Sequence, residues 1–214
     1  QPPGIVVDAL GAGSLDLKTD YELYAPLTTL PKKFTVTSPY MLAKMVANQH
    51  YANLEDLVMG LAEVLREQVL RIGADVIQVD EANLTGHPED ADMAAAGINR
   101  GFDGVTAERG VHLCFGNYGG QTIQEGTYEK LVGFLNSLEA DHLVLEIARR
   151  PAEELVMLKE VKDSLGLGIG VIDIKDNEVE SAELVARRIE QAAGIVGAER
   201  IQYVHPDCGF WMLS

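Results

Sequence analysis

The sequence has 214 residues, 47% of them hydrophobic, and a mean hydropathy of +0.02. This composition fits a globular chain with one sizeable core and excludes disordered and fibrous proteins. Thirty-three acidic residues against 17 basic ones give a formal net charge of -16, which would repel nucleic acid and anionic lipid surfaces. We therefore expect the partner to be a small molecule or another copy of the chain.

The chain has no sequence signal for export or for membrane insertion. Its apolar stretches have the length of strands, well short of the roughly 20 residues that cross a bilayer, and its start lacks the basic and apolar regions of a signal peptide. Its two cysteines, Cys114 and Cys208, are therefore expected as free or metal-bound thiolates rather than as a disulfide. We expect a cytoplasmic location.

From residue 34 onward, short β-rich runs alternate with helical patterns, which predicts βα units and a parallel sheet. The predicted strands are 34–37, 75–79, 110–114, 142–146, 168–174 and 200–204, and a seventh candidate is 5–7. One apolar helical stripe begins after Asn53 as N-cap and stops at Gly73. Ser181 caps a second helix that precedes Gly197, and a third helix follows Pro151.

Residues 8–33 show no sustained period and are expected to form a long irregular connection, either an arm or a cover for an active site. The remaining pattern holds six or seven strands, fewer than the eight of a (β/α)8 barrel, which typically has about 250 residues. We interpret residues 1–214 as a single catalytic domain of α/β class. The expected fold is an incomplete (β/α)8 TIM-type barrel that lacks its first strands and its final helix.

Polar side chains gather where the predicted strands end. They are Asp80 and Glu81, His112 and Cys114, Glu146, Asp173 and Lys175, and Cys208. Taken singly, such residues can be helix N-caps or solvated charges. In a parallel barrel, however, the carboxyl ends of the strands form the active site. Their joint placement therefore predicts a functional site at one rim.

Both cysteines belong to this group. His112 and Cys114 are two residues apart on a predicted strand, so their side chains would project from the same face. With Glu146 and Cys208 they provide one nitrogen, two thiolates and a carboxylate, enough for a tetrahedral zinc site. Two thiolates and a carboxylate outweigh the charge of Zn²⁺, so such a site suits the binding of a substrate thiol as thiolate better than the generation of hydroxide. Alkyl transfer to sulfur is the chemistry that this set indicates.

Five segments together resemble the cobalamin-independent methionine synthases, relatives of uroporphyrinogen decarboxylase. They are Ile77–Glu81, Val111–Asn117, Leu145–Arg149, Val171–Lys175 and Pro206–Gly209, and they occur in the order of that family. The resemblance implies a (β/α)8 barrel that holds zinc through His112, Cys114, Glu146 and Cys208. It also implies methyl transfer from methyltetrahydrofolate to homocysteine. Asp80 would then contact the amino acid substrate, a charge-assisted bond worth about 1.5–3 kcal/mol.

Two segments depart from the family pattern. After Asp80 and Glu81 the chain continues Ala82 to Gly86 without the usual proline and second glutamate, and Lys175 stands where the synthases carry a histidine thought to donate a proton. Lys175 could donate a proton if its pKa were lowered, or it could bind an anionic substrate group. The second role suits a related enzyme, epoxyalkane:coenzyme M transferase, which adds a thiol to an epoxide. A non-catalytic zinc-binding barrel is the alternative from another class.

Two further residues are candidates for the site. Ser38 ends the first clear strand where the family has a turn that lines the pocket, and it is expected with Asp80 and Glu81 among the substrate-binding residues. His205 stands three residues before Cys208 and could compete as a ligand. We expect it instead to pack beside Tyr203 at the end of its strand.

Overall fold

The computed structural model describes residues 3–117 and 122–210, and its centre is a six-stranded parallel sheet. The strands are β2 (Lys33–Thr37), β4 (Val76–Glu81), β5 (Glu108–Leu113), β6 (His142–Leu145), β7 (Gly166–Ile172) and β8 (Ile201–Pro206). They lie in the order β2-β4-β5-β6-β7-β8, so each pairs with its neighbour in the chain apart from the short β3. The six predicted strands and the parallel α/β sheet are confirmed.

Two very short strands form a second sheet. β1 (Ile5–Val6) pairs in parallel with β3 (Ala47–Asn48). The candidate strand at 5–7 is therefore confirmed, but its partner was not predicted. A two-residue segment has too little apolar periodicity to be recognised before its pairing is known.

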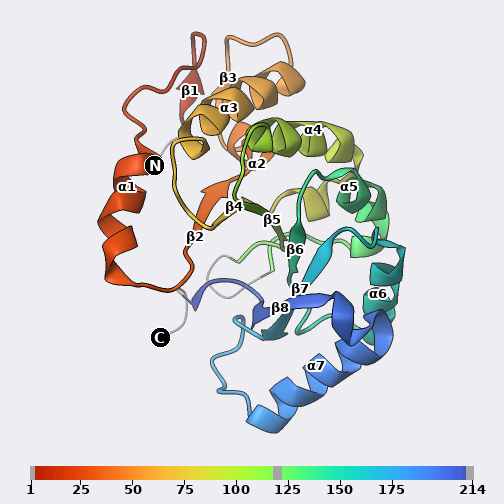
Figure 1. Cartoon of the computed structure of the whole chain (residues 1–214). Coiled ribbons are helices and arrows are strands. Elements are labelled where there is room, and N and C mark those ends of the chain that lie inside the picture. The colour runs from red at the N-terminus through yellow and green to blue at the C-terminus, as the bar shows by residue number, and fades with distance from the viewer. Residues whose placement is uncertain (1–2, 118–121, 211–214) are drawn as a thin grey trace.

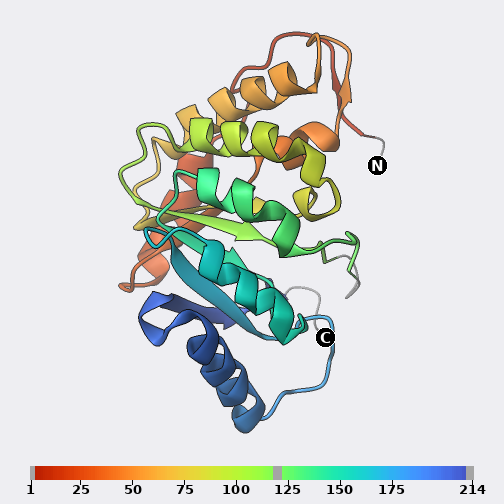
Figure 2. The ribbon, with the colours of Figure 1, turned by 90° about the vertical axis from the view of Figure 1, so that its right-hand side faces the viewer.

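Helices cover one side of the large sheet (Figures 1 and 2). The α-helices are α1 (Leu17–Tyr24), α2 (Pro39–Lys44), α3 (Leu54–Val69), α4 (Ala91–Phe102), α5 (Val132–Ser137), α6 (Ala152–Val156) and α7 (Ala182–Val196). The short 3-10 helices are η1 (Ala25–Leu27), η2 (Leu84–Gly86), η3 (Pro88–Asp90), η4 (Tyr128–Leu131), η5 (Met157–Glu160) and η6 (Ala198–Arg200). Figure 1 shows α3 to α7 in chain order along the outer side of the strands.

The predicted starts of α3 and α7 and the end of α7 are confirmed, whereas α3 ends at Val69, four residues before the predicted stop at Gly73. Asn53 accepts a hydrogen bond from the Asp56 amide at 2.8 Å and starts α3, and Ser181 accepts one from the Leu184 amide at 3.2 Å and starts α7. α7 stops at Gly197, whose φ of 89° is a left-handed conformation that favours glycine. The apolar face of α3 buries Leu57 and Val58 in the core, and that of α7 buries Ala192 and Val196.

Residues 8–33, which were expected as an irregular connection, contain α1 and η1. A helix of eight residues is marginal by itself, so its sequence pattern is weak. Contacts with the end of α3 hold it: the Leu17 amide donates to Gln68 Oε1 at 3.2 Å, and the Tyr21 hydroxyl donates to the Gly73 carbonyl at 2.7 Å.

The sheet does not close by hydrogen bonding within the described residues, because β2 and β8 are its two edges. Its inner face is nevertheless strongly curved. Lys33 Nζ on β2 stands 5.3 Å from the ring centroid of Tyr203 on β8, so the two edge strands meet through their side chains. A curved parallel sheet with helices outside is the arrangement of a barrel wall. In the described part of the chain, no helix combines the length and apolar character needed to cross a membrane.

Candidate metal centre

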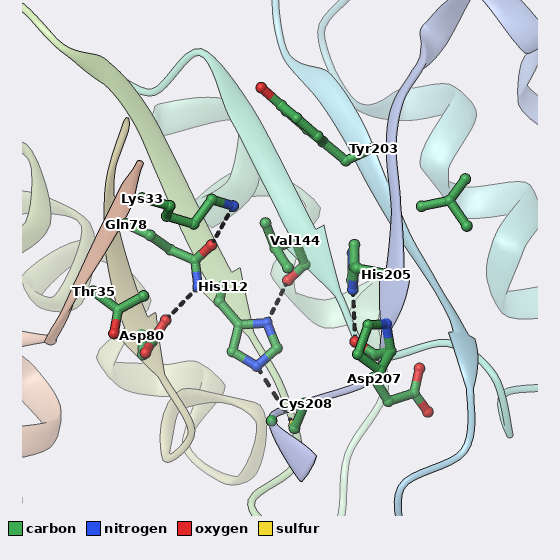
Figure 3. A pocket seen from close by; sticks show the side chains of 13 residues that line it. Lys33, Thr35, Gln78, Asp80, His112, Val144, Tyr203, His205, Asp207 and Cys208 are labelled. Atoms are coloured by element: carbon green, nitrogen blue, oxygen red, sulfur yellow. Dashed lines mark hydrogen bonds between the residues drawn. The ribbon is translucent and has the colours of Figure 1, made fainter. Parts of the chain in front are cut away.

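The carboxyl ends of β5 and β8 bring His112, Cys114 and Cys208 together. One ligand atom from each residue lies within 4.8 Å of the others. The Cys208 sulfur is 3.5 Å from His112 Nε2, although the two residues are 96 positions apart (Figure 3). Both cysteines are free thiols. Parallel strands place their carboxyl ends at one edge of the sheet, which explains the meeting of such distant residues.

A backbone carbonyl holds the His112 ring in place. His112 Nδ1 lies 2.9 Å from the Val144 carbonyl oxygen on β6. Because a carbonyl only accepts hydrogen bonds, Nδ1 must carry the hydrogen. In the neutral ring, Nε2 then carries the free electron pair. This nitrogen faces Cys208. Metal-binding histidines are commonly oriented in this way by a partner on their other nitrogen.

The charges of the three groups depend on one another. The hydrogen bond with Cys208 lowers the pKa of Cys114 well below its ordinary value despite burial, and His112 adds to this effect. The same hydrogen bond, together with burial, raises the pKa of the Cys208 thiol. Burial alone would lower the pKa of His112, but the charges of Cys114 and Asp80 outweigh it and raise the pKa to about 9. Within the cluster, negative charge on Cys114 and positive charge on His112 thus stabilise each other.

This donor set fits zinc. One imidazole nitrogen and two sulfurs are ligands that Zn²⁺ prefers, and three protein ligands leave a fourth position for another group. Cys114 and His112 are 6% and 8% exposed, so a cation here would be largely shielded from water. The fit follows from the residue types, the spacing of their ligand atoms and the orientation of the His112 ring.

Glu146, expected as the fourth ligand, lies outside the group of three. Its buried carboxylate accepts a hydrogen bond from the Phe115 amide at 3.0 Å and forms an ion pair with Lys175. The Lys175 side chain is only 1% exposed. The Tyr128 hydroxyl donates to the Leu113 carbonyl at 2.8 Å and accepts from the Glu146 amide at 3.0 Å, which joins the ends of β5 and β6.

A cavity of about 390 Å³ is lined by His112 and Cys208 of this group. Asp80 lines it and stands in register with His112 on the neighbouring strand. The Asp80 carboxylate accepts a hydrogen bond from Gln78 Nε2 at 2.7 Å. Burial raises the pKa of Asp80, so a cationic group that entered the cavity would be paired with a poorly solvated carboxylate.

Ser38 and Glu81 meet each other rather than the cavity. The Ser38 hydroxyl donates to the Glu81 carboxylate and also accepts from the Met41 amide at 3.0 Å, as the N-cap of α2. The second Glu81 oxygen accepts from the Asn83 and Leu84 amides at 2.7 and 3.0 Å. Among the described residues that line the cavity, neither Ser38 nor Glu81 is present. Both side chains stabilise the turns after β2 and β4, and their expected role in substrate binding stays a prediction.

Sequence reasoning missed part of the cavity wall. Lys33, Thr35, Gln78 and Tyr203 line it together with His205. Lys33 and Thr35, like Gln78 and Asp80, are two positions apart, so alternating polar residues in otherwise apolar strands were the available signal. His205 does lie near Tyr203 on β8, and its Nδ1 is 2.7 Å from the Pro206 carbonyl oxygen.

Comparison with known proteins adds an independent result. The family model described as "Cobalamin-independent synthase, Catalytic domain" matches residues 1–213. The methionine synthase of Thermococcus kodakarensis is 32% identical over 185 residues, which are 85% of this chain and 52% of that protein. The methionine synthase of Pyrococcus furiosus is 29% identical over the same length. The chain thus spans about half the length of these curated relatives.

Solved structures agree with this result. A B12-independent methionine synthase from Shewanella sp. W3-18-1, in complex with selenomethionine, superposes with a TM-score of 0.79 at 26% identity, over 92% of this chain and 61% of that one. A methyltransferase from Methanosarcina mazei shares the fold, with a TM-score of 0.56 at 13% identity. Because the family model matches residues 1–213 of the chain, the chain belongs to the family of the cobalamin-independent synthase catalytic domain.

Proposed function

We propose that this chain carries the thiol-activating centre of a zinc-dependent methyltransferase that methylates homocysteine to methionine. The observation that carries the proposal is the meeting of His112, Cys114 and Cys208 beside a cavity lined by Asp80. Bound zinc would take the substrate thiol as an additional ligand and lower its pKa, so that the sulfur is a nucleophilic thiolate at neutral pH.

The residues around the centre would orient the His112 ligand, bind the substrate and limit the access of water. The Val144 carbonyl holds the His112 ring with Nε2 toward the site. Asp80, itself fixed by Gln78, would pair with the substrate ammonium group and hold the amino acid in one orientation. The burial of Cys114 and His112 would limit the access of water to the thiolate and keep its charge available for attack on the methyl group.

Glu146 and Lys175 act as a pair in this proposal. Glu146 would be the fourth, weakest ligand and would give way to the incoming thiol. Lys175 contacts the Glu146 carboxylate, so its role would be to hold that carboxylate when it leaves the metal. This arrangement places Lys175 next to a protein carboxylate rather than next to an anionic substrate group. It favours the methionine synthase interpretation over the transfer of coenzyme M to an epoxide.

The relatives support the same choice of substrates. The curated proteins named above are methionine synthases, so homocysteine and methyltetrahydrofolate are the proposed thiol and methyl donor. We further propose that the curved sheet belongs to a (β/α)8 barrel, in which β2 and β8 would pair with further strands. The cytoplasmic location stays a prediction, and the closeness of two free thiols favours a reducing compartment.

Two measurements test the proposal. Elemental analysis of protein purified without chelators is expected to find one zinc per chain, and its absence would overturn the proposal. In the full-length protein, homocysteine with methyltetrahydrofolate is expected to yield methionine, whereas coenzyme M with a short epoxide yields no product. The reverse result would assign the other reaction.

Variants separate the proposed ligands. Cys208→Ala is expected to lose most of the bound zinc, because it removes one of the two sulfurs. Glu146→Gln is expected to retain part of the metal and to change the affinity for the thiol. Full activity in both variants would show that the site has been assigned to the wrong residues.

A further inference from the structure

Asp207, the residue before Cys208, is buried without touching the cluster of His112, Cys114 and Cys208. It is 1% exposed, and Figure 3 shows its carboxylate turned away from the ring of His112. Asp207 Oδ1 accepts hydrogen bonds from the Ile147 and Ala148 amides, both at 2.9 Å. These amides belong to the two residues that follow Glu146.

The backbone of Asp207 makes a third connection. Its amide donates to the carbonyl of Ile172, the last residue of β7, at 2.9 Å. One residue therefore links the ends of β6, β7 and β8. Removal of this side chain would leave two backbone amides without their acceptor.

The sequence of β7 leaves room for this carboxylate. A Cβ on Gly170 would lie 2.1 Å from Asp207 Oδ1, 2.8 Å from the Leu145 carbonyl oxygen on β6 and 3.1 Å from the Asp207 Cα. Gly168 lies two positions earlier on the same face of β7 and leaves room for His205. A Cβ on Gly168 would lie 3.0 Å from His205 Nε2. The glycines of β7 thus let the residues of β8 approach the sheet closely.

We propose that Asp207 is a positioning residue that sets the Cys208 sulfur against His112 and Cys114 and ties it to the segment that carries Glu146. The inference rests on the proposed metal-thiol function and deepens it. Cys208 follows the end of β8 and lies in a loop, so the preceding residue is where the structure anchors it. Without the Asp207 carboxylate, two amides lose their acceptor and the loop is free to move.

Cobalt(II) in place of zinc provides the test, because the intensity of its thiolate charge-transfer bands reports how many cysteine sulfurs bind the metal. Asp207→Ala is expected to reduce the bands to those of Cys208→Ala and to weaken cobalt binding, measured against a chelator, by about 10–100-fold, the usual effect of losing a partner behind a ligand. Asp207→Asn keeps an accepting oxygen and is expected to restore both signals. Failure of this rescue would overturn the role of the two hydrogen bonds.

Gly170→Ala tests the same idea without changing Asp207, and it decides the question if Asp207→Ala does not fold. Its Cβ would displace both the Asp207 carboxylate and the Leu145 carbonyl, which precedes Glu146, so the same loss of band intensity is expected. Gly133→Ala, where a Cβ meets nothing within 4 Å, is the matched control. Unchanged bands in the folded Asp207 and Gly170 variants would overturn the inference alone. A wild-type protein without thiolate bands would overturn the proposed function as well.

Discussion

His112 and His142 are buried histidines on neighbouring strands of the same sheet, yet their surroundings have opposite effects. The pKa of His112 is raised to about 9, where the charges of Cys114 and Asp80 outweigh burial. Burial and the charge of Lys33 lower the pKa of His142 to about 4. Burial is thus common to both, and the charges of the neighbours decide whether each ring is protonated.

The partners of the two histidines also differ in kind. Around His142, at the amino-terminal half of the sheet, the neighbouring polar groups are the side chains of Glu108, Tyr203 and Gln202. Its Nδ1 lies 2.8 Å from Glu108 Oε1, and the same oxygen accepts hydrogen bonds from the Tyr203 hydroxyl at 2.8 Å and from Gln202 Nε2 at 3.0 Å. Around His112 the neighbours are two thiols beside a cavity. The groups around His112 can bind a metal, whereas those around His142 contribute to the stability of the fold.

The largest expected difference is in metal binding. His112→Asn should lower the affinity for zinc by more than about 100-fold, since a direct ligand should matter more than the outer partners, whose loss costs about 10–100-fold. His142→Asn is the matched control and should leave the affinity nearly unchanged. Competition with a chromophoric chelator measures both. Equal losses in the two variants would contradict the distinction between the two regions.

The second prediction concerns the stability of the folded state against acid. The pKa of His142 is about 4 in the folded protein and about 6.5 when unfolded. The unfolded chain therefore binds more protons between these values, so the free energy of unfolding falls as the pH is lowered from 6.5 to 4. The difference of about 2.5 pKa units corresponds to roughly 3 kcal/mol.

Urea unfolding of wild-type protein and His142→Asn across this range measures that contribution. The variant should show a flatter dependence on pH. Glu108 and Asp141 act on His142 in the direction opposite to Lys33, and Asp207, whose pKa burial raises to about 7, has the opposite effect on acid stability. The difference between the two proteins, rather than the wild-type curve, therefore isolates His142. Parallel curves would show that His142 makes no such contribution.

The sequence predicted the strands because apolar and β-branched runs are long enough to identify them. It also predicted that His112, Cys114 and Cys208 would meet, because the polar residues stand where the strands end. That rule places a residue at an edge of the sheet, but it does not say which neighbour its side chain contacts. The ion pair of Glu146 with Lys175 and the contact of Ser38 with Glu81 are such contacts.

The cluster around His142 could not be predicted for a related reason. Tyr203 and Glu108 are 95 positions apart, and the curvature of the sheet brings them together. Local periodicity carries no information on curvature, which depends on the packing of all strands and helices. The same limit applies to α1, a helix held by contacts with α3 rather than by its own pattern.

The third prediction is a steric one. A Cβ on Gly110 would lie 2.6 Å from His142 Nε2. Gly110→Ala should therefore force the His142 ring to move and lower the free energy of unfolding by about 1–3 kcal/mol. Its zinc content should stay the same, in contrast to Gly170→Ala. Urea unfolding with elemental analysis makes the comparison, and a loss of zinc in Gly110→Ala would show that the two ends of the sheet are coupled.

The smallest expected effect is that of Tyr203→Phe. The change removes the hydrogen bond to Glu108 but keeps the ring beside that of His142, at 4.7 Å between centroids. A single hydrogen bond to a charged acceptor contributes about 1.5–3 kcal/mol, and the lower end is expected because Tyr203 is only half-buried. Glu108 would then have one donor fewer and would attract the protonated His142 ring more strongly. The pKa of His142 should therefore rise, and NMR titration measures it. If the pKa and the free energy of unfolding were both unchanged, the Tyr203 hydroxyl would not belong to the group of side chains that sets the pKa of His142.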